Sequence, residues 1–74
     1  MDLNLVVLAG RLASPPEVRQ FEGGTKILRL LVMTRTEDPN PRVDVVPVTM
    51  YVDEVPEWAN TLAPGHRVWV AGSA

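Results

Sequence analysis

Four stretches of closely spaced apolar residues are separated along the chain by short segments rich in proline and glycine. They cover residues 3–12, 26–35, 42–52 and 67–72. Valine, leucine and isoleucine dominate them, and the stretches are short and bounded by turn-forming residues, which favours strands over helices. The pattern therefore predicts four β-strands.

Alternate residues of these strands divide into two faces, because successive side chains of a strand point to opposite sides. One predicted face carries Val6, Leu8, Leu12, Leu28, Leu30, Val32, Thr34, Val46, Val48, Met50, Val68 and Val70. The other carries Leu5, Val7, Ala9, Arg11, Ile27, Arg29, Leu31, Met33, Arg35, Val45, Pro47, Thr49, Tyr51, Trp69 and Ala71. The first face predicts the core. In the first strand both faces are largely apolar, so both are expected to be covered, and Gly10 predicts a bend or bulge there.

Two segments connect the strands in characteristic ways. Residues 53–63 predict a short helix that Asp53 caps, with an apolar stripe of Val55, Trp58, Ala59 and Leu62. We expect Trp58 to plug the end of the core rather than to contact a ligand. Residues 13–25 predict a rigid connector, because Pro15-Pro16 forces an extended course and Gly23-Gly24 permits the return into the next strand.

Composition excludes several classes of site and of protein. The chain has no cysteine and one histidine, His66, so it offers neither a disulfide nor a zinc ligand set, and His66 is assigned no role. It shows no paired nucleophile and base and no phosphate-binding loop, so we expect neither an enzyme nor a cofactor. No apolar run approaches the ~20 residues of a membrane helix, and the acidic N-terminus is unlike a signal peptide. A cytoplasmic protein is expected.

Size and charge point to partners. A chain of 74 residues without disulfides is marginally stable alone, which favours oligomerisation. The net charge of −2 argues mildly against general nucleic-acid binding, but the placement of charges matters more than their sum. Most of the arginines lie on the predicted strands, where neighbouring strands could align them into a basic stripe.

The stretch LNLVVLAGRLASPPEVR, residues 3–19, resembles the N-terminal signature of bacterial single-stranded DNA-binding proteins. The matching positions are Asn4, Gly10, Arg11, Leu12, Pro16, Glu17, Val18, Arg19 and Gly24, followed by Gly65 and 68–72. The resemblance implies an OB-fold, which is a five-stranded Greek-key barrel. It also implies a non-enzymatic homo-oligomer, usually a tetramer, that coats single-stranded DNA in replication, recombination and repair and is associated with the nucleoid.

Only part of that barrel is expected here. Residues 1–74 predict a single, mainly β domain with the order β-β-β-α-β, in which the closing fifth strand is missing and the C-terminal end is incomplete. The acidic tail of the family is missing as well. We expect the first strand to lose a pairing partner, and the open barrel to expose edges and core.

Single-strand binding requires cations that follow the phosphates and aromatic rings that stack on bases. The predicted nucleic-acid-binding residues are Arg11, Arg29, Arg35, Arg42, Tyr51 and Trp69. Each arginine could instead serve a solubilising face, Tyr51 could pack in the ordinary way, and Trp69 could lie in a subunit interface. Arg19 could contact phosphate or pair with Glu17, of which the second is slightly favoured.

An apolar outer face on the first strand, formed by Leu5, Val7 and Ala9, is expected to join subunits, as the resemblance implies. A second function also fits the sequence: an OB-fold oligomerisation or protein-interaction module with weak or no DNA affinity. The net acidity, the short acidic segment TEDPNPR at 36–42, the scarcity of aromatic residues and Val45 at a position where the family commonly has tryptophan favour this alternative.

Overall fold

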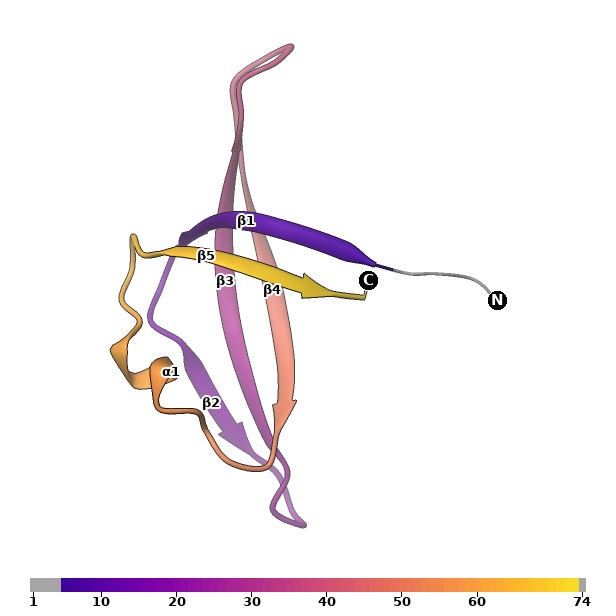
Figure 1. Cartoon of the computed structure of the whole chain (residues 1–74), viewed down its shortest axis with the longest axis vertical. Helices are drawn as coiled ribbons and strands as arrows, with labels where there is room; N and C mark the ends of the chain where they lie inside the picture. Colours follow the sequence, from indigo (N-terminus) through magenta and orange to yellow (C-terminus); the bar gives the residue numbers. More distant parts are fainter. Residues whose placement is uncertain (1–4, 74) are drawn as a thin grey trace.

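The fold is known from a computed structural model, which describes residues 5–73. Residues 3 and 4, where the first strand was predicted to begin, lie outside that range. The elements follow one another as β1 (Val6–Leu12), β2 (Glu17–Gln20), β3 (Lys26–Thr36), β4 (Arg42–Val52), α1 (Trp58–Thr61) and β5 (Arg67–Gly72) (Figure 1). All strand pairs are antiparallel and belong to one five-stranded sheet.

The long β3–β4 hairpin is the axis of the molecule. β4 pairs with β3 along its whole length. The other edge of β3 is shared, since β2 pairs with its first part and β1 with Val32 and Met33 further along. β5 then pairs with β1, and Figure 1 shows β1 and β5 running across the hairpin, whose upper end projects beyond them. This crossing brings four strands together at one place on the sheet.

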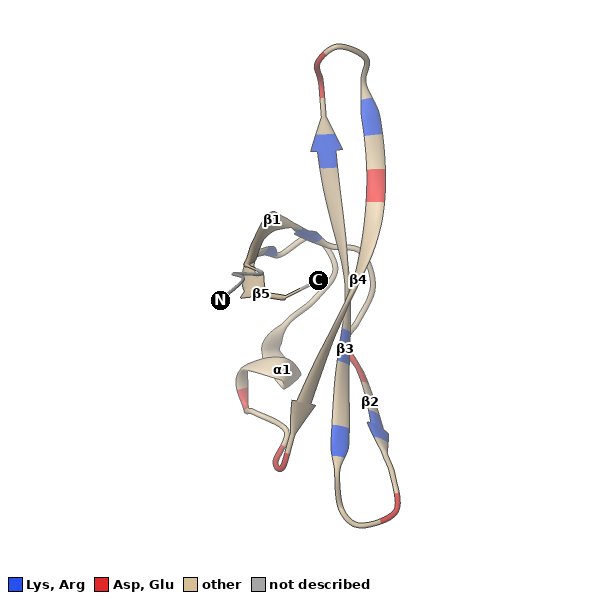
Figure 2. Cartoon of the chain, turned by 90° about the vertical axis from the view of Figure 1, so that its right-hand side faces the viewer, with Lys and Arg blue, Asp and Glu red and all other residues tan. Residues whose placement is uncertain are grey.

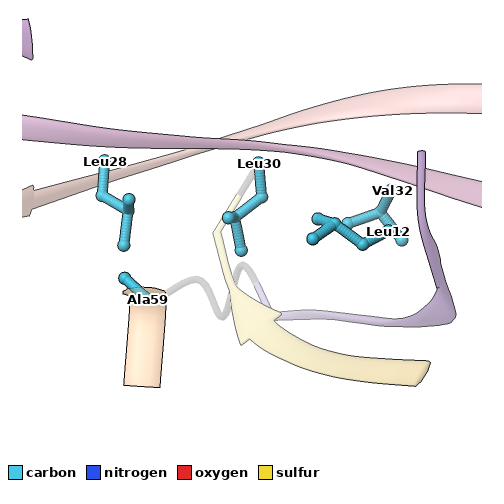
Figure 3. Close-up of a cluster of buried hydrophobic side chains, with 5 residues drawn as sticks. All are labelled: Leu12, Leu28, Leu30, Val32 and Ala59. Carbon is cyan, nitrogen blue, oxygen red and sulfur yellow. The ribbon is translucent and has the colours of Figure 1, made fainter. Parts of the chain in front are cut away.

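The bounds and faces of the four predicted strands agree closely with the structure. Leu12, Leu28, Leu30 and Val32 are buried, while their neighbours in sequence are more exposed. They form one cluster with Ala59 of α1, on the side of the sheet that faces the helix (Figure 3). We call this side the inner face and the opposite side the outer face. Alternation alone was sufficient to assign both.

The connector between the first two predicted strands is itself partly a strand, which corrects the expectation. After Pro15-Pro16, residues Glu17–Gln20 pair with the beginning of β3 as β2. Gly23 and Gly24 have φ angles of 88° and 86°, so they make the turn that the sequence predicted. All four residues of β2 are exposed, so its sequence lacks the apolar alternation that would have predicted a strand.

The helix is shorter than predicted. It spans Trp58–Thr61, and its N-cap is Glu57, so Asp53 does not cap it. Proline disfavours helical geometry in the residue before it, so Pro56 delays the helix. Trp58 is also not the expected plug, because its side chain is 44% exposed and the buried helical residue is Ala59.

The described part of the chain forms an open antiparallel sheet. Within residues 5–73, β4 and β5 do not pair with each other, and a groove of about 600 Å³ runs between them. Val46, Val48, Met50 and Val70 line it from the inner face. β1 pairs with β5 from Val6 to Arg11, but with β3 only at Arg11 and Leu12. Within the described residues, its Val6–Gly10 part therefore has a strand partner on one side only.

Candidate nucleic-acid interface

Basic and acidic residues occupy different parts of the fold. All seven lysines and arginines lie on strands. Glu17 and Asp44 are the acidic residues on the described strands, and the other described acids are in connecting segments (Figure 2). The sheet therefore has a basic character despite the net charge of −2.

The outer face collects most of this positive charge. Strand pairing and alternation place five basic residues there: Arg11, Arg19, Arg29, Arg35 and Arg67. Glu17 is the acidic residue of the described strands on this face, and it lies directly opposite Arg29. Five arginines against one strand carboxylate give the outer face a surplus of positive charge.

Two exposed aromatic side chains share this face with the arginines. Tyr51 is 75% exposed and lies opposite Ile27, and Trp69 is 80% exposed and lies opposite Ala9. The structure thus places five of the six residues predicted to bind nucleic acid on one face of the sheet. The two aromatic rings lie on different strands, Tyr51 near the C-terminal end of β4 and Trp69 on β5.

Arg42 is not part of this group. It alternates with the inner-face residues of β4, and its Nε donates a hydrogen bond to Asp44 Oδ2 at 2.8 Å. Lys26 also belongs to the inner side, and its Nζ lies 3.6 Å from Glu54 Oε2. The two basic residues of the inner side are therefore each beside a carboxylate, whereas on the outer face only Arg35 forms a salt bridge within the described residues.

Local contacts orient two of the outer-face arginines. Arg11 Nη1 donates a hydrogen bond to the carbonyl oxygen of Gly65 at 2.9 Å. Arg35 Nε is 2.7 Å from Glu37 Oε1, and both side chains of that pair are largely exposed. A guanidinium has five N–H donors, so each side chain retains donors for a ligand.

Three further residues of this face were not predicted as binding residues. Arg67 alternates with Val68 and lies opposite Arg11, and Arg19 lies opposite Ile27. Phe21 continues the alternation of β2, donates its backbone N–H to the Thr25 carbonyl oxygen and is half exposed. The alternation of Arg67 with Val68 and Val70 was a usable signal, whereas Phe21 follows a strand that the sequence did not reveal.

The surface between Tyr51 and the crossing of the strands is aliphatic. Leu31, Met33, Val43, Val45 and Pro47 occupy the outer face there. Such side chains can cover a base, but they lack the π-face that makes aromatic stacking favourable. The outer face is therefore richer in cations than in stacking platforms.

His66 lies in an exposed turn, where its Nδ1 accepts a hydrogen bond from the Ala63 backbone N–H at 3.2 Å. In residues 5–73, no cluster of three or more His, Cys, Asp and Glu side chains could hold a metal ion. No helix in that range has the length and apolar character needed to cross a membrane.

Comparison with known proteins finds one family match and a similar solved structure. Residues 3–74 match the single-strand binding protein family. No curated protein sequence matches. A solved structure described as a Plasmodium falciparum SSB complex with ssDNA resembles the chain with a TM-score of 0.82 and 26% sequence identity. That alignment covers 99% of this chain and 70% of the other.

Proposed function

This chain belongs to the single-strand binding protein family, so its function is single-stranded DNA binding, and we propose that the outer face carries it without sequence preference. The family binds DNA and does not catalyse a reaction, in agreement with the expectation that the chain is not an enzyme. The observation that carries the assignment to this face is the gathering of five arginines and two exposed aromatic rings there.

In the proposed mechanism, the arginines follow the phosphates while aromatic rings stack on bases. Arg29 and Tyr51 occupy neighbouring positions on the paired strands β3 and β4, so one nucleotide could contact both. Arg11, Arg35, Arg67 and Trp69 extend the basic surface to the crossing of β1 and β5. Phosphates and π-faces are common to all nucleotides, so this mode of binding does not depend on sequence.

Salt is expected to weaken binding steeply. About five arginine–phosphate contacts on a single strand predict a loss of affinity of about 100-fold between about 50 and 200 mM salt, because released counterions drive binding. Fluorescence anisotropy of a labelled oligo-dT strand, titrated with protein at several salt concentrations, measures the slope. An affinity that does not change with salt contradicts electrostatic binding.

A matched pair of variants locates the binding face. Arg29→Ala is expected to weaken binding and to reduce the steepness of the salt dependence by about 0.7 in log–log slope, the value for one contact. Arg42→Ala removes an arginine that is paired with Asp44 on the other side of the sheet, so it should leave the slope unchanged. If Arg42→Ala reduces the slope and Arg29→Ala does not, the outer face is not the DNA-binding surface.

Adding an aromatic ring to the aliphatic part of the face should strengthen binding. Val45 is half exposed and lies opposite Met33 on the outer face, so tryptophan can replace it without entering the core. One added base stack predicts a gain of about 1–3 kcal/mol, or about 5- to 150-fold in affinity for oligo-dT. Val45→Leu, measured in the same titration, controls for added apolar area.

Self-association is proposed to use β1. Val7 and Ala9 are exposed on its outer face, Leu5 is exposed just before the strand begins, and the Val6–Gly10 part of the strand pairs with β5 alone. A second copy could pair along that free edge and cover Leu5 and Val7. Such an oligomer would coat single-stranded DNA near the nucleoid during replication, recombination and repair. Sedimentation of the protein with Val7→Glu beside the unchanged chain tests this interface.

A further inference from the structure

The crossing of β1 over the hairpin aligns four strands in a single transverse row. Val45 of β4 lies opposite Met33 of β3, Met33 opposite Arg11 of β1, and Arg11 opposite Arg67 of β5. Residues that are directly opposite on neighbouring antiparallel strands have Cβ atoms about 4.5–5.5 Å apart. Two arginines therefore stand side by side in the middle of the outer face.

A cavity of about 350 Å³ lies at this row. Arg11, Arg35, Arg67 and Trp69 are among the residues that line it, together with Met33 and Val43. No aspartate or glutamate belongs to its lining in the described part of the chain. Glu37, which pairs with Arg35, lies outside the cavity. Three guanidinium groups and an indole thus surround one concave space without an acid among them.

Like charges directly opposite each other destabilise a sheet. Arg11 and Arg67 are in this arrangement. Arg35, whose charge is paired with Glu37, adds further N–H donors to the same cavity. The Arg11–Gly65 hydrogen bond holds one of these guanidinium groups in place but does not neutralise it. An anion in the cavity would offset the repulsion and would accept charge-assisted hydrogen bonds from several donors at once.

We propose that this cavity is a site for a nucleotide phosphate carrying two or more negative charges, with the base stacked on Trp69. An internal phosphodiester has one negative charge, whereas a phosphomonoester has about 1.5 to 2 at pH 7. The opposed charges of Arg11 and Arg67, with the remaining N–H donors of Arg35, match a phosphomonoester better than an internal phosphodiester. The ligand would be the phosphorylated end of a DNA strand or a free nucleotide. The strand-end form rests on the proposed DNA-binding function, and the free-nucleotide form does not.

The site is separate from the surface around Tyr51. Val45, in the row that borders the cavity, and Tyr51 are six residues apart on β4, which corresponds to about 20 Å along an extended strand. A strand whose terminal phosphate occupies the cavity could therefore reach Tyr51 with nucleotides further along. The cavity would then favour strand ends over internal positions.

Competition between oligonucleotides tests the strand-end form. Unlabelled oligo-dT of about eight nucleotides, within the site size of one OB-fold, competes with an internally labelled strand at low salt. Versions with a 5′-phosphate, a 3′-phosphate or no terminal phosphate are compared. We expect one phosphorylated version to compete about three- to tenfold better than the unphosphorylated strand, the range for partly exposed charge-assisted contacts.

Thermal unfolding tests the free-nucleotide form. Thymidine diphosphate, at concentrations well above those of the protein, should raise Tm, because a ligand that binds only the folded state stabilises it. Thymidine without phosphate is the matched control. A rise with the diphosphate and no advantage for phosphorylated strands would identify the free nucleotide as the ligand, and the opposite pair of results would identify the strand end.

Variants assign either effect to the cavity. Arg67→Ala should abolish the phosphate advantage and the Tm rise, Arg67→Lys should keep part of them, and Arg42→Ala should keep both. Arg67→Ala removes one of two opposed charges from the strand surface, so it should fold at least as stably as the unchanged protein.

If neither probe shows a phosphate effect, or if the effect persists in Arg67→Ala, the cavity is not a phosphate site. Absence of binding by all strands, together with a Tm rise that requires Arg67, would overturn the proposed DNA-binding surface and leave the phosphate site in place.

Discussion

Replacing Tyr51 with alanine is expected to weaken the binding of oligo-dT about 5- to 150-fold. Removal of one base–aromatic stack costs about 1–3 kcal/mol in single-strand binding proteins. Tyr51 is 75% exposed on the outer face, opposite Ile27 and beside the arginine-bearing part of β3. Phe21 and Trp69 are the other aromatic residues assigned to this face, and the neighbouring outer-face residues of β3 and β4 are aliphatic.

The effect can be separated from a change in folding. Tyr51 makes no side-chain hydrogen bond within the described residues, and its exposure means that alanine leaves no internal cavity. Tyr51→Phe keeps the ring and should bind almost as well as the unchanged protein. Anisotropy titrations of both variants, with Tm measured in parallel, check the prediction. Equal affinity of Tyr51→Ala and Tyr51→Phe would show that no base stacks there.

Replacing Gly10 with alanine is expected to destabilise the fold by at least about 1–3 kcal/mol, the usual cost of inserting a group into a well-packed site. A Cβ atom at Gly10 would overlap the backbone carbonyl oxygen of Met33 and would lie 2.9 Å from Val32 Cγ1. The carbonyl belongs to the backbone of a paired strand, so it cannot rotate away as a side chain could. β1 must therefore move away from β3 where the two strands cross.

Gly72→Ala is the matched control for this variant. Gly72 also lies on a strand, opposite Val6, but nothing lies within 4 Å of the position of an added Cβ. Alanine there should be neutral or slightly stabilising, because it reduces the freedom of the unfolded chain. A loss of 1 kcal/mol lowers Tm by about 4–8 °C in a domain of this size, so thermal unfolding resolves the difference. Equal Tm values for the two variants would show that β1 and β3 are not in close contact at Gly10.

The separation of core and binding surface follows from one property of strands. Because alternate side chains point to opposite faces, the same strand β3 supplies Leu28, Leu30 and Val32 to the core and Arg29 and Arg35 to the outer face. Substitutions on the outer face can therefore change DNA affinity with little effect on stability. Val45→Trp should raise DNA affinity and Tyr51→Ala should lower it, both with little effect on stability.

Local sequence was sufficient for the strands and their faces. The bounds of β3, β4 and β5 agree with the predicted ranges to within one residue, because strong apolar alternation and proline- or glycine-rich turns are both local signals. The resemblance in residues 3–19 was likewise readable from consecutive residues and agrees with the family match. Local signals failed where they were weak: β2 has only exposed side chains, and Pro56 delayed a helix that the apolar stripe alone placed too early.

Which side chains become neighbours required the fold. Arg11 and Arg67 are far apart in the chain and meet because β1 pairs with β5, and Arg35 joins them at the cavity because β1 crosses the hairpin there. The period of a strand assigns each of these arginines to a face, but it contains no information about register between strands. Register depends on long-range pairing and on close approaches such as that of Gly10 to Met33. For that reason the basic face could be predicted from the sequence, and alternation with Val46 and Val48 already assigns Arg42 to the opposite face. The three-arginine cavity became visible only in three dimensions.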